Sequence, residues 1–257
     1  MNTAMGNVVE WHRAATALGG RMNSGSNSAL LGSVLAINQI VNASFPTGSF
    51  SHSYGLETLI AQGEVADGPA LEKACRAWLR YSVCTADGIA VAQAHSAARE
   101  EDLPRLLDID RRISVMRLTR ETRAASALTG RALLNAALVA LDAPLLRSLS
   151  FREDPPAEEV QHPVVFGAVL ALAGAAEDEA VALFLLSSFS SLLAVGARLL
   201  PLGQAQVQGI IAGCRDLFVD CARISQERSL DQMSAAATHI EIVSMQHERQ
   251  PSRLCMS

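Results

Sequence analysis

The segment Ala180–Ala197, AVALFLLSSFSSLLAVGA, constrains the fold of this chain more than any other part of it. It carries no charge and lies between Glu179 and Arg198, so it needs an apolar environment. A membrane-spanning helix needs about 20 apolar residues. This segment is slightly shorter and contains serines at positions 187, 188, 190 and 191. We therefore expect a buried helix inside a helical bundle, and we expect no membrane association.

The composition indicates the same fold class. Apolar residues make up 49% of the 257 residues but aromatic residues only 4%, so the core must consist mostly of Ala, Leu, Val and Ile. Small aliphatic residues favour closely packed helices over a β-sandwich, whose strands favour β-branched and aromatic side chains. No segment stands out with the two-residue period of a strand. The prediction is an all-α, single-domain helical bundle.

The chain divides into three parts. Residues 1–28 are rich in Gly, Ser and Asn, which predicts a flexible N-terminal arm. We expect the all-helical domain over residues 29–229 and a C-terminal helix followed by a polar tail over residues 230–257. Inside the domain, Asp67 and Asp102 each precede a proline by two residues. An aspartate followed by a proline in the first turn is typical of a helix start.

Two helical patterns suggest tertiary contacts. The clearest heptad in the sequence places apolar residues at positions 207, 210, 214, 217, 221 and 224 of one expected helix. This pattern indicates burial against another helix, within the chain or across a dimer. On a second expected helix, Glu121 falls on the apolar face. A carboxylate at that place needs an arginine or backbone donors, and an ion pair at the edge of the core is the favoured interpretation.

Charge and cysteine content exclude two classes of protein. The net charge is −5 and no long basic run is present, whereas nucleic-acid-binding proteins carry a basic stripe or patch. The five cysteines are odd in number and form no CxxC pair, and the first forty residues lack a signal-peptide pattern. These features predict a reduced, cytoplasmic protein.

The stretch FPTGSFSHSYGLE at 45–57 is the densest cluster of chemically active side chains. It lacks the GxSxG spacing of a serine-hydrolase elbow. The only lysine, Lys73, lies outside any P-loop pattern. The histidines lack metal-site spacing, although His52 and His247 stay as secondary metal candidates. A helical enzyme in which Ser51, His52 and Glu57 converge remains an alternative function.

Five segments together carry a resemblance to a known family. They are FPTGSFSHSYGLET at 45–58, ETRAASALTGRALL at 121–134, HPVVFG at 162–167, RLLPLGQ at 198–204, and EIVSMQHE with SRLCMS at 241–257. In this order and with this spacing they resemble the UreF family of urease accessory proteins. The resemblance covers the chain from about Leu35 onward.

The resemblance implies an all-α homodimer without catalytic activity of its own. Such a protein binds a UreD-type (UreH-type) scaffold, recruits the GTPase UreG, and docks on apo-urease to promote nickel delivery. It implies no permanently bound cofactor, because the assembled complex handles the nickel. An alternative function within the same assembly is regulation of GTP hydrolysis by UreG, through an arginine offered to the GTPase.

The resemblance also assigns candidate site residues. The partner-binding candidates are Phe50, Ser51, His52, Tyr54, Gly55, Glu57, Arg198, Pro201, Gly203, Gln204, His247, Arg253 and Leu254. Glu121 and Arg123 are assigned structural roles, and Arg253 belongs to a tail expected to become ordered when the scaffold binds. Cys255 stands where the family has an aromatic residue, and it is a third secondary metal candidate beside His52 and His247.

Overall fold

A computed structural model describes residues 24–48, 52–151, 160–235 and 237–255 of the chain, and these residues contain helices but no strands. The all-α prediction is therefore confirmed for the described part of the chain. The elements are α2 (Ser24–Val41), α3 (Leu56–Ala61), α4 (Gly68–Trp78), η2 (Leu79–Asp87), α5 (Gly88–Arg99), α6 (Leu103–Met116), α7 (Arg120–Ala140), α8 (Pro144–Ser150), α9 (His162–Leu172), α10 (Glu177–Leu199), α11 (Gln204–Gly213), α12 (Arg215–Gln226), η4 (Leu230–Gln232) and α13 (Thr238–His247).

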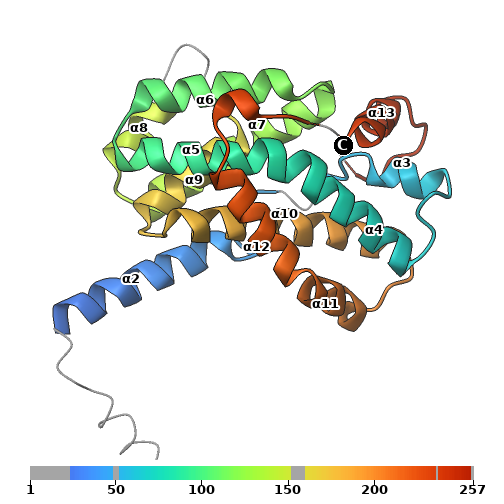
Figure 1. The fold of residues 1–257 in the computed structure, drawn as a ribbon, viewed down its shortest axis with the longest axis horizontal. Coiled ribbons are helices and arrows are strands. Elements are labelled where there is room, and N and C mark those ends of the chain that lie inside the picture. The colour runs from blue at the N-terminus through green and yellow to red at the C-terminus, as the bar shows by residue number, and fades with distance from the viewer. Residues whose placement is uncertain (1–23, 49–51, 152–159, 236, 256–257) are drawn as a thin grey trace, which may run out of the picture.

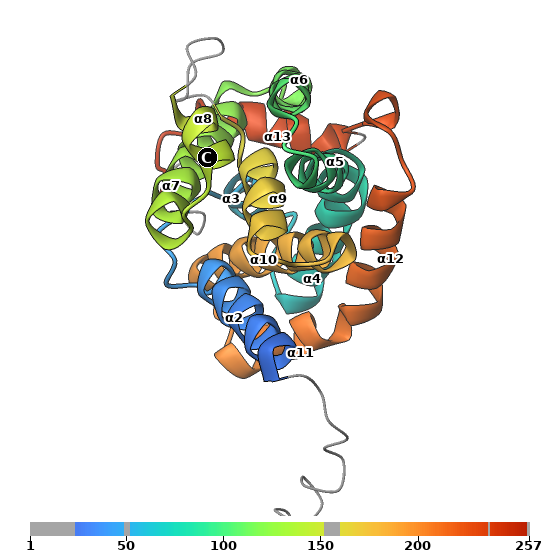
Figure 2. The same cartoon turned by 90° about the vertical axis from the view of Figure 1, so that its left-hand side faces the viewer.

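Helix α9 lies at the centre of the bundle, with α5, α7 and α10 around it (Figure 2). Its sequence HPVVFGAVLAL has no charged residue, and nearly all of it is buried. Gly167 permits the closest approach to α5, because a Cβ at this position would lie 2.4 Å from the carbonyl oxygen of Val91. The absence of a side chain at Gly167 thus sets the distance between the two central helices.

Helix α10 contains the uncharged segment 180–197, so the helix predicted there is confirmed. It is the one helix in the described residues that is long and apolar enough to cross a membrane, and half of its most apolar window is buried inside the molecule. The helix packs against α4, α5, α9 and α12 (Figure 1). This packing is that of a core helix in a bundle.

A continuous helical segment runs from α4 through η2 into α5. Asp67 caps its start by accepting a hydrogen bond from the backbone N of Ala70 at 2.9 Å, and Asp102 caps α6 in the same way. Both predicted helix starts are confirmed. The middle of the segment, η2, is a π-helix, a rare and wider form that is often associated with functional sites.

The heptad that begins at Val207 does not form one helix, and this prediction is wrong. The chain leaves the helical path at Cys214, between α11 and α12. Gly209 and Gly213 lower the helix propensity just before the break. The positions 207, 214 and 221 are nevertheless buried within this chain, with α10 and η2 among the neighbouring elements.

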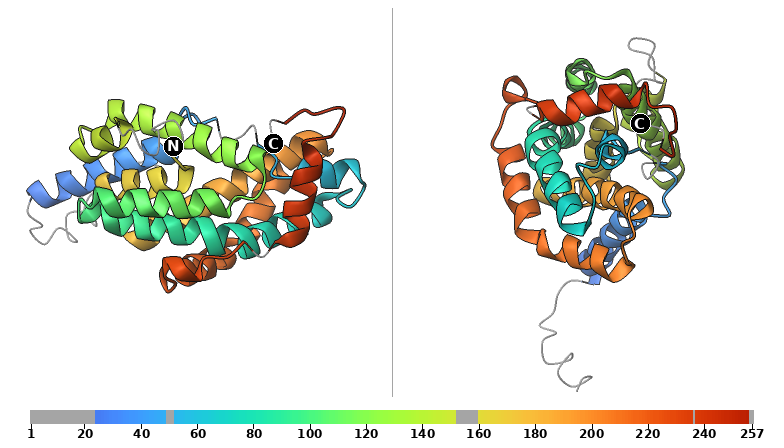
Figure 3. Two further views of the ribbon diagram at one scale, coloured as in Figure 1. Left: turned by 90° about the horizontal axis from the view of Figure 1, so that it is seen from above. Right: turned by 90° about the vertical axis from the view of Figure 1, so that its right-hand side faces the viewer.

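The two ends of the described chain differ in how they meet the bundle. Helix α2 projects from the bundle (Figure 1), and it starts at Ser24, inside the predicted arm. Residues 1–23 of that arm lie outside the described residues. Helix α13 packs on α3 and α7 at the other end of the molecule (Figure 3). The segment 248–255 that follows α13 forms the C-terminal tail discussed below.

Candidate functional site

The chain around Gly55 is shaped to receive helix α13. Tyr54 and Gly55 both have positive φ angles, 50° and 86°, a backbone conformation that glycine adopts most readily. A Cβ at Gly55 would lie 2.9 Å from the backbone N of Ser244 and 3.0 Å from a methyl carbon of Val243. Gly55 therefore allows the start of α3 to lie directly against α13.

Glu57, on α3, binds the C-terminal tail. Its carboxylate accepts hydrogen bonds from the backbone N of Leu254 at 2.7 Å and of Cys255 at 3.0 Å. The side chain is 6% exposed. Burial acts to raise the pKa of Glu57, but hydrogen bonds from Leu254, His247 and Cys255 outweigh it, and the pKa lies below its ordinary value. The carboxylate form of Glu57 thus holds the tail on the body.

His247 connects Glu57 to a second carboxylate, Glu121 on α7. Its Nε2 lies 3.1 Å from an oxygen of Glu57, and its Nδ1 lies 2.7 Å from an oxygen of Glu121. Arg253 of the tail donates to the other oxygen of Glu121 at 2.7 Å. When both ring nitrogens carry protons, the fully buried His247 donates to both carboxylates. We call Glu57, Glu121, His247 and Arg253 the tail-docking cluster.

The tail presents an apolar side chain beyond this cluster. Leu254 is 82% exposed, although its backbone N is bound by Glu57. Cys255 is partly buried against the core. Burial and the neighbouring Glu57 raise the pKa of its thiol to about 11, while the charge of Arg198 acts in the opposite direction. The end of α10, which carries Arg198, therefore lies close to the docked tail.

The structure places several of the candidate partner-binding residues inside the chain. His52, Gly55, Glu57 and His247 are buried. His52 and Gly55 shape the loop against its neighbours, whereas Glu57 and His247 satisfy each other and the tail. Tyr54 is partly exposed and stacks near Trp78, with ring centroids 5.3 Å apart.

Other candidates lie on the surface of the chain. Pro201, Gly203, Gln204, Arg253, Leu254 and Arg198 are all exposed. Phe50 and Ser51 lie outside the described residues. Of the two residues assigned structural roles, Glu121 belongs to the tail-docking cluster and Arg123 is exposed on α7. The tail expected to order on scaffold binding is already placed against the body in this chain.

The secondary metal candidates do not come together as a ligand set. In the described part of the chain, no group of three His, Cys, Asp or Glu side chains is arranged to hold a metal ion. Burial lowers the pKa of His52. Both ring nitrogens of His247 face carboxylates, and the raised pKa of Cys255 disfavours the thiolate that binds metals.

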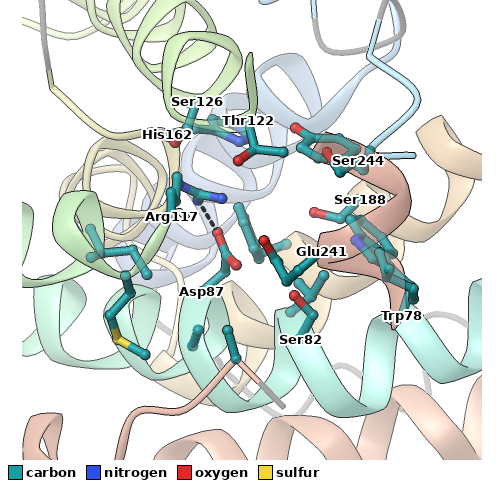
Figure 4. A pocket seen from close by; sticks show the side chains of 18 of the residues that line it. Trp78, Ser82, Asp87, Arg117, Thr122, Ser126, His162, Ser188, Glu241 and Ser244 are labelled. Atoms are coloured by element: carbon teal, nitrogen blue, oxygen red, sulfur yellow. Dashed lines mark hydrogen bonds and ion pairs between the residues drawn. The ribbon is translucent and has the colours of Figure 1, made fainter. Parts of the chain in front are cut away.

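A polar cavity of about 60 Å³ lies inside the bundle, between η2, α10 and α13 (Figure 4). Asp87 and Arg117 form an ion pair there, and Glu241 and Ser188 face the same space. The residues that line it include Tyr54, Trp78, Ser82, Asp87, Arg117, Thr122, Ser126, His162, Ser187, Ser188, Ser191, Glu241 and Ser244. Of residues 52–57, only Tyr54 lines the cavity, so His52 and Glu57 do not converge there as the enzyme alternative requires.

The ionisable groups of this cavity have shifted pKa values. Burial raises the pKa of Tyr54 to about 12, while Arg117 lowers it and Asp87 raises it. Burial lowers the pKa of His162 to about 3. Burial also raises the pKa of Glu241, with Arg117 opposing and Asp87 reinforcing the shift. The sequence analysis did not predict this cavity. The feature of the sequence that indicates it is the group of serines within the apolar segment 180–197.

Known proteins provide an independent comparison. A family model described as UreF matches residues 65–215. The chain is 30% identical to the urease accessory protein UreF of Actinobacillus pleuropneumoniae serotype 5b over 227 residues, which covers 88% of this chain and 100% of that protein. It is also 30% identical to UreF of a Bradyrhizobium strain over 242 residues, with 93% and 98% covered. UreF of Geobacillus kaustophilus is 29% identical over 230 residues, with 87% and 98% covered. The chain therefore belongs to the UreF family of urease accessory proteins.

Proposed function

We propose that this chain is a non-catalytic urease maturation factor that acts through protein contacts. It binds a UreD-type (UreH-type) scaffold and the GTPase UreG and brings them together on apo-urease. It holds no permanent cofactor, and the nickel is handled by the assembled complex. The protein works in the cytoplasm as a homodimer. Membership of the UreF family supports this proposal.

The observation that carries the proposal is the docked tail. Two carboxylates, the buried Glu57 and the partly buried Glu121, hold the backbone and the arginine of the tail. They leave the apolar side chain of Leu254 in solvent. An exposed apolar residue on a fixed backbone suits a binding surface, because the partner does not have to order the chain first.

The end of α10 extends this surface. The positive charge of Arg198 acts to lower the pKa of Cys255, so the end of α10 and the tail are neighbours. Pro201, Gly203 and Gln204 follow directly in the chain and are exposed. Arginine is a frequent energetic centre of protein interfaces, and the fully buried core of an interface is more apolar than its rim. We infer that tail and α10 end together contact the scaffold.

The homodimer is supported by a different part of the molecule. Leu30, Leu31, Val34 and Leu35 of α2 are each at least half exposed. A groove of about 590 Å³ lies beside the end of α2 and is lined in part by apolar residues of α2 and α10. Contiguous exposed apolar surface of this kind marks interaction sites. A second copy of the chain would cover it.

The test is reconstitution of the complex from purified proteins. The full chain is mixed with the UreD-type scaffold and with UreG, and the assemblies are sized by gel filtration with light scattering. Three variants are compared with it: a chain shortened to residues 1–250, Arg253→Ala, and the matched control Arg249→Ala, whose arginine is also exposed.

We expect the full chain and Arg249→Ala to form the complex. The shortened chain fails to bind the scaffold, and Arg253→Ala binds more weakly. Equal binding by all four proteins would remove the tail from the interface. No binding by the full chain would contradict the proposed function itself.

A further inference from the structure

The polar cavity contains buried polar atoms that this chain leaves unpaired. Within the described residues, Arg117 Nε, Glu241 Oε2 and Ser244 Oγ are buried and have no hydrogen-bond partner. All three residues line the cavity. Native proteins pair nearly all buried polar groups with protein atoms or with bound molecules. These three atoms therefore point to an occupant of the cavity.

The charges around the cavity favour an uncharged occupant. Asp87 and Arg117 neutralise each other as an ion pair. The low pKa of His162 keeps its ring neutral, and the raised pKa of Glu241 favours its uncharged form. An ion placed here would lose its hydration, and the Asp87–Arg117 pair has no net charge to compensate it, which is unfavourable in a protein interior.

The lining determines the hydrogen-bonding character of the occupant. Six serines contribute hydroxyl groups, and hydroxyls both donate and accept hydrogen bonds; they are Ser82, Ser126, Ser187, Ser188, Ser191 and Ser244. Arg117 Nε can only donate, so the occupant must also carry an acceptor. The volume of about 60 Å³ corresponds to about four water molecules.

We propose that the polar cavity binds a compact, uncharged molecule that both donates and accepts hydrogen bonds, either a cluster of ordered waters or a small amide of the same size. The occupant accepts from Arg117 Nε and bonds to Glu241 and Ser244. The π-helical segment η2 contributes Ser82 and Asp87 to the same wall. Because Glu241 and Ser244 belong to α13, the occupant also ties α13 to the body of the bundle.

Two measurements on the full chain distinguish the two sources. A high-resolution crystal structure of the protein without small-molecule additives shows whether ordered waters bridge Arg117 Nε and Ser244 Oγ. A titration with acetamide, followed by NMR of the backbone amides, shows whether a small amide displaces them. Formate and methylammonium serve as charged probes of similar size. Bridging waters alone identify water as the occupant, and saturable shifts around the cavity with acetamide identify an amide.

Variants test the assigned atoms. Ser244→Ala removes one hydrogen-bond partner with little change in shape, so it loses a bridging water or weakens acetamide binding about fivefold, as expected for one hydrogen bond. Glu241→Gln keeps a side chain of the same size, whose amide both donates and accepts hydrogen bonds, and it retains the occupant. The control Ser148→Ala alters an exposed serine on α8 and leaves occupancy unchanged.

The proposal is overturned in either of two cases. In one, the wild-type crystal structure shows no ordered density between Arg117 and Ser244, and acetamide gives no saturable shifts. In the other, formate or methylammonium binds the cavity more tightly than acetamide. Neither result depends on assembly with a partner, so these experiments test the cavity independently of the proposed function in urease maturation.

Discussion

Helices α5 and α9 meet through backbone atoms and small side chains, whereas the C-terminal tail meets the body through buried carboxylates. At the first contact, Gly167 lies against the backbone of Val91 and His95. At the second, Glu57 and Glu121 bind the tail through hydrogen bonds and an ion pair. The first contact leaves no room for an added atom, whereas the second consists mainly of polar contacts that protonation or substitution can remove. The difference separates a contact set by close packing from one set by hydrogen bonds and charge.

The largest loss of stability is expected from adding one methyl group between α5 and α9. Gly167→Ala places a Cβ 2.4 Å from a backbone oxygen that has little freedom to move. We expect a loss of about 3 kcal/mol of unfolding free energy, the upper range for overpacking. Urea denaturation followed by circular dichroism measures the change.

Gly209→Ala is the matched control for this substitution. Gly209 lies within α11, and no atom would lie within 4 Å of its Cβ. Alanine there should raise stability by up to about 1 kcal/mol, because glycine is a poor helix former. Equal loss of stability in both variants would show that the close α5–α9 contact is not decisive.

Removal of the main tail contact has the next largest effect. Glu57→Ala leaves His247 and the backbone N of Leu254 and Cys255 without their acceptor. We expect a loss of about 2 kcal/mol, since unpaired buried groups cost about 1–3 kcal/mol each. The tail amides should also become mobile in ¹⁵N relaxation. Glu72→Ala, which removes a half-exposed glutamate on α4, serves as the control. A tail that stays ordered in Glu57→Ala would refute the assigned role of Glu57.

Acid should release the tail while the α5–α9 contact persists. The pKa of Glu57 in the folded chain is below its ordinary value of 4.5. Its contribution to docking is therefore complete above pH 4.5 and is lost as the pH falls through the lowered pKa. ¹⁵N relaxation of Leu254 and Cys255 between about pH 7 and pH 3 follows the release. Glu57→Gln should abolish this pH-dependent step, and an unchanged profile in that variant would assign it to another group.

The smallest expected effect on stability comes from Arg253→Ala. The side chain is 43% exposed, and its ion pair with Glu121 lies at the rim of the cluster. Such pairs contribute less than about 1 kcal/mol, so thermal unfolding should hardly change. A drop in the melting temperature as large as that of Glu57→Ala would show that Arg253 stabilises the folded chain as much as Glu57 does.

The helices that could be predicted from the sequence are those with strong local signals. The uncharged segment 180–197 has to form a buried helix, and it does so in α10. Asp67 and Asp102 cap helices through hydrogen bonds that depend on neighbouring residues alone. The break at Cys214 was missed because the apolar heptad outweighed the low helix propensity of Gly209 and Gly213, and no local pattern distinguishes the π-helix η2 from an α-helix.

The candidate site could be predicted only in part for a similar reason. The position of Glu121 on an apolar face indicated that it needs a partner, but nothing local identified Arg253 and His247. The three are brought together only by the fold. Likewise, the serines of α10 indicated polarity inside an apolar helix, but Glu241 and Ser244 come from a distant segment. Pairings at such separations follow from topology and not from sequence pattern.

The separation between Glu57 and its partners has a consequence for synthesis of the protein. The residues that donate to Glu57 lie 190 to 198 positions later in the chain. During translation, the carboxylate of Glu57 therefore stays hydrated until residue 255 has left the ribosome. A chain that stops between the end of α13 at His247 and residue 253 contains every helix of the bundle but cannot form the docked tail. The tail-docking cluster therefore forms only after every helix of the described bundle has been synthesised.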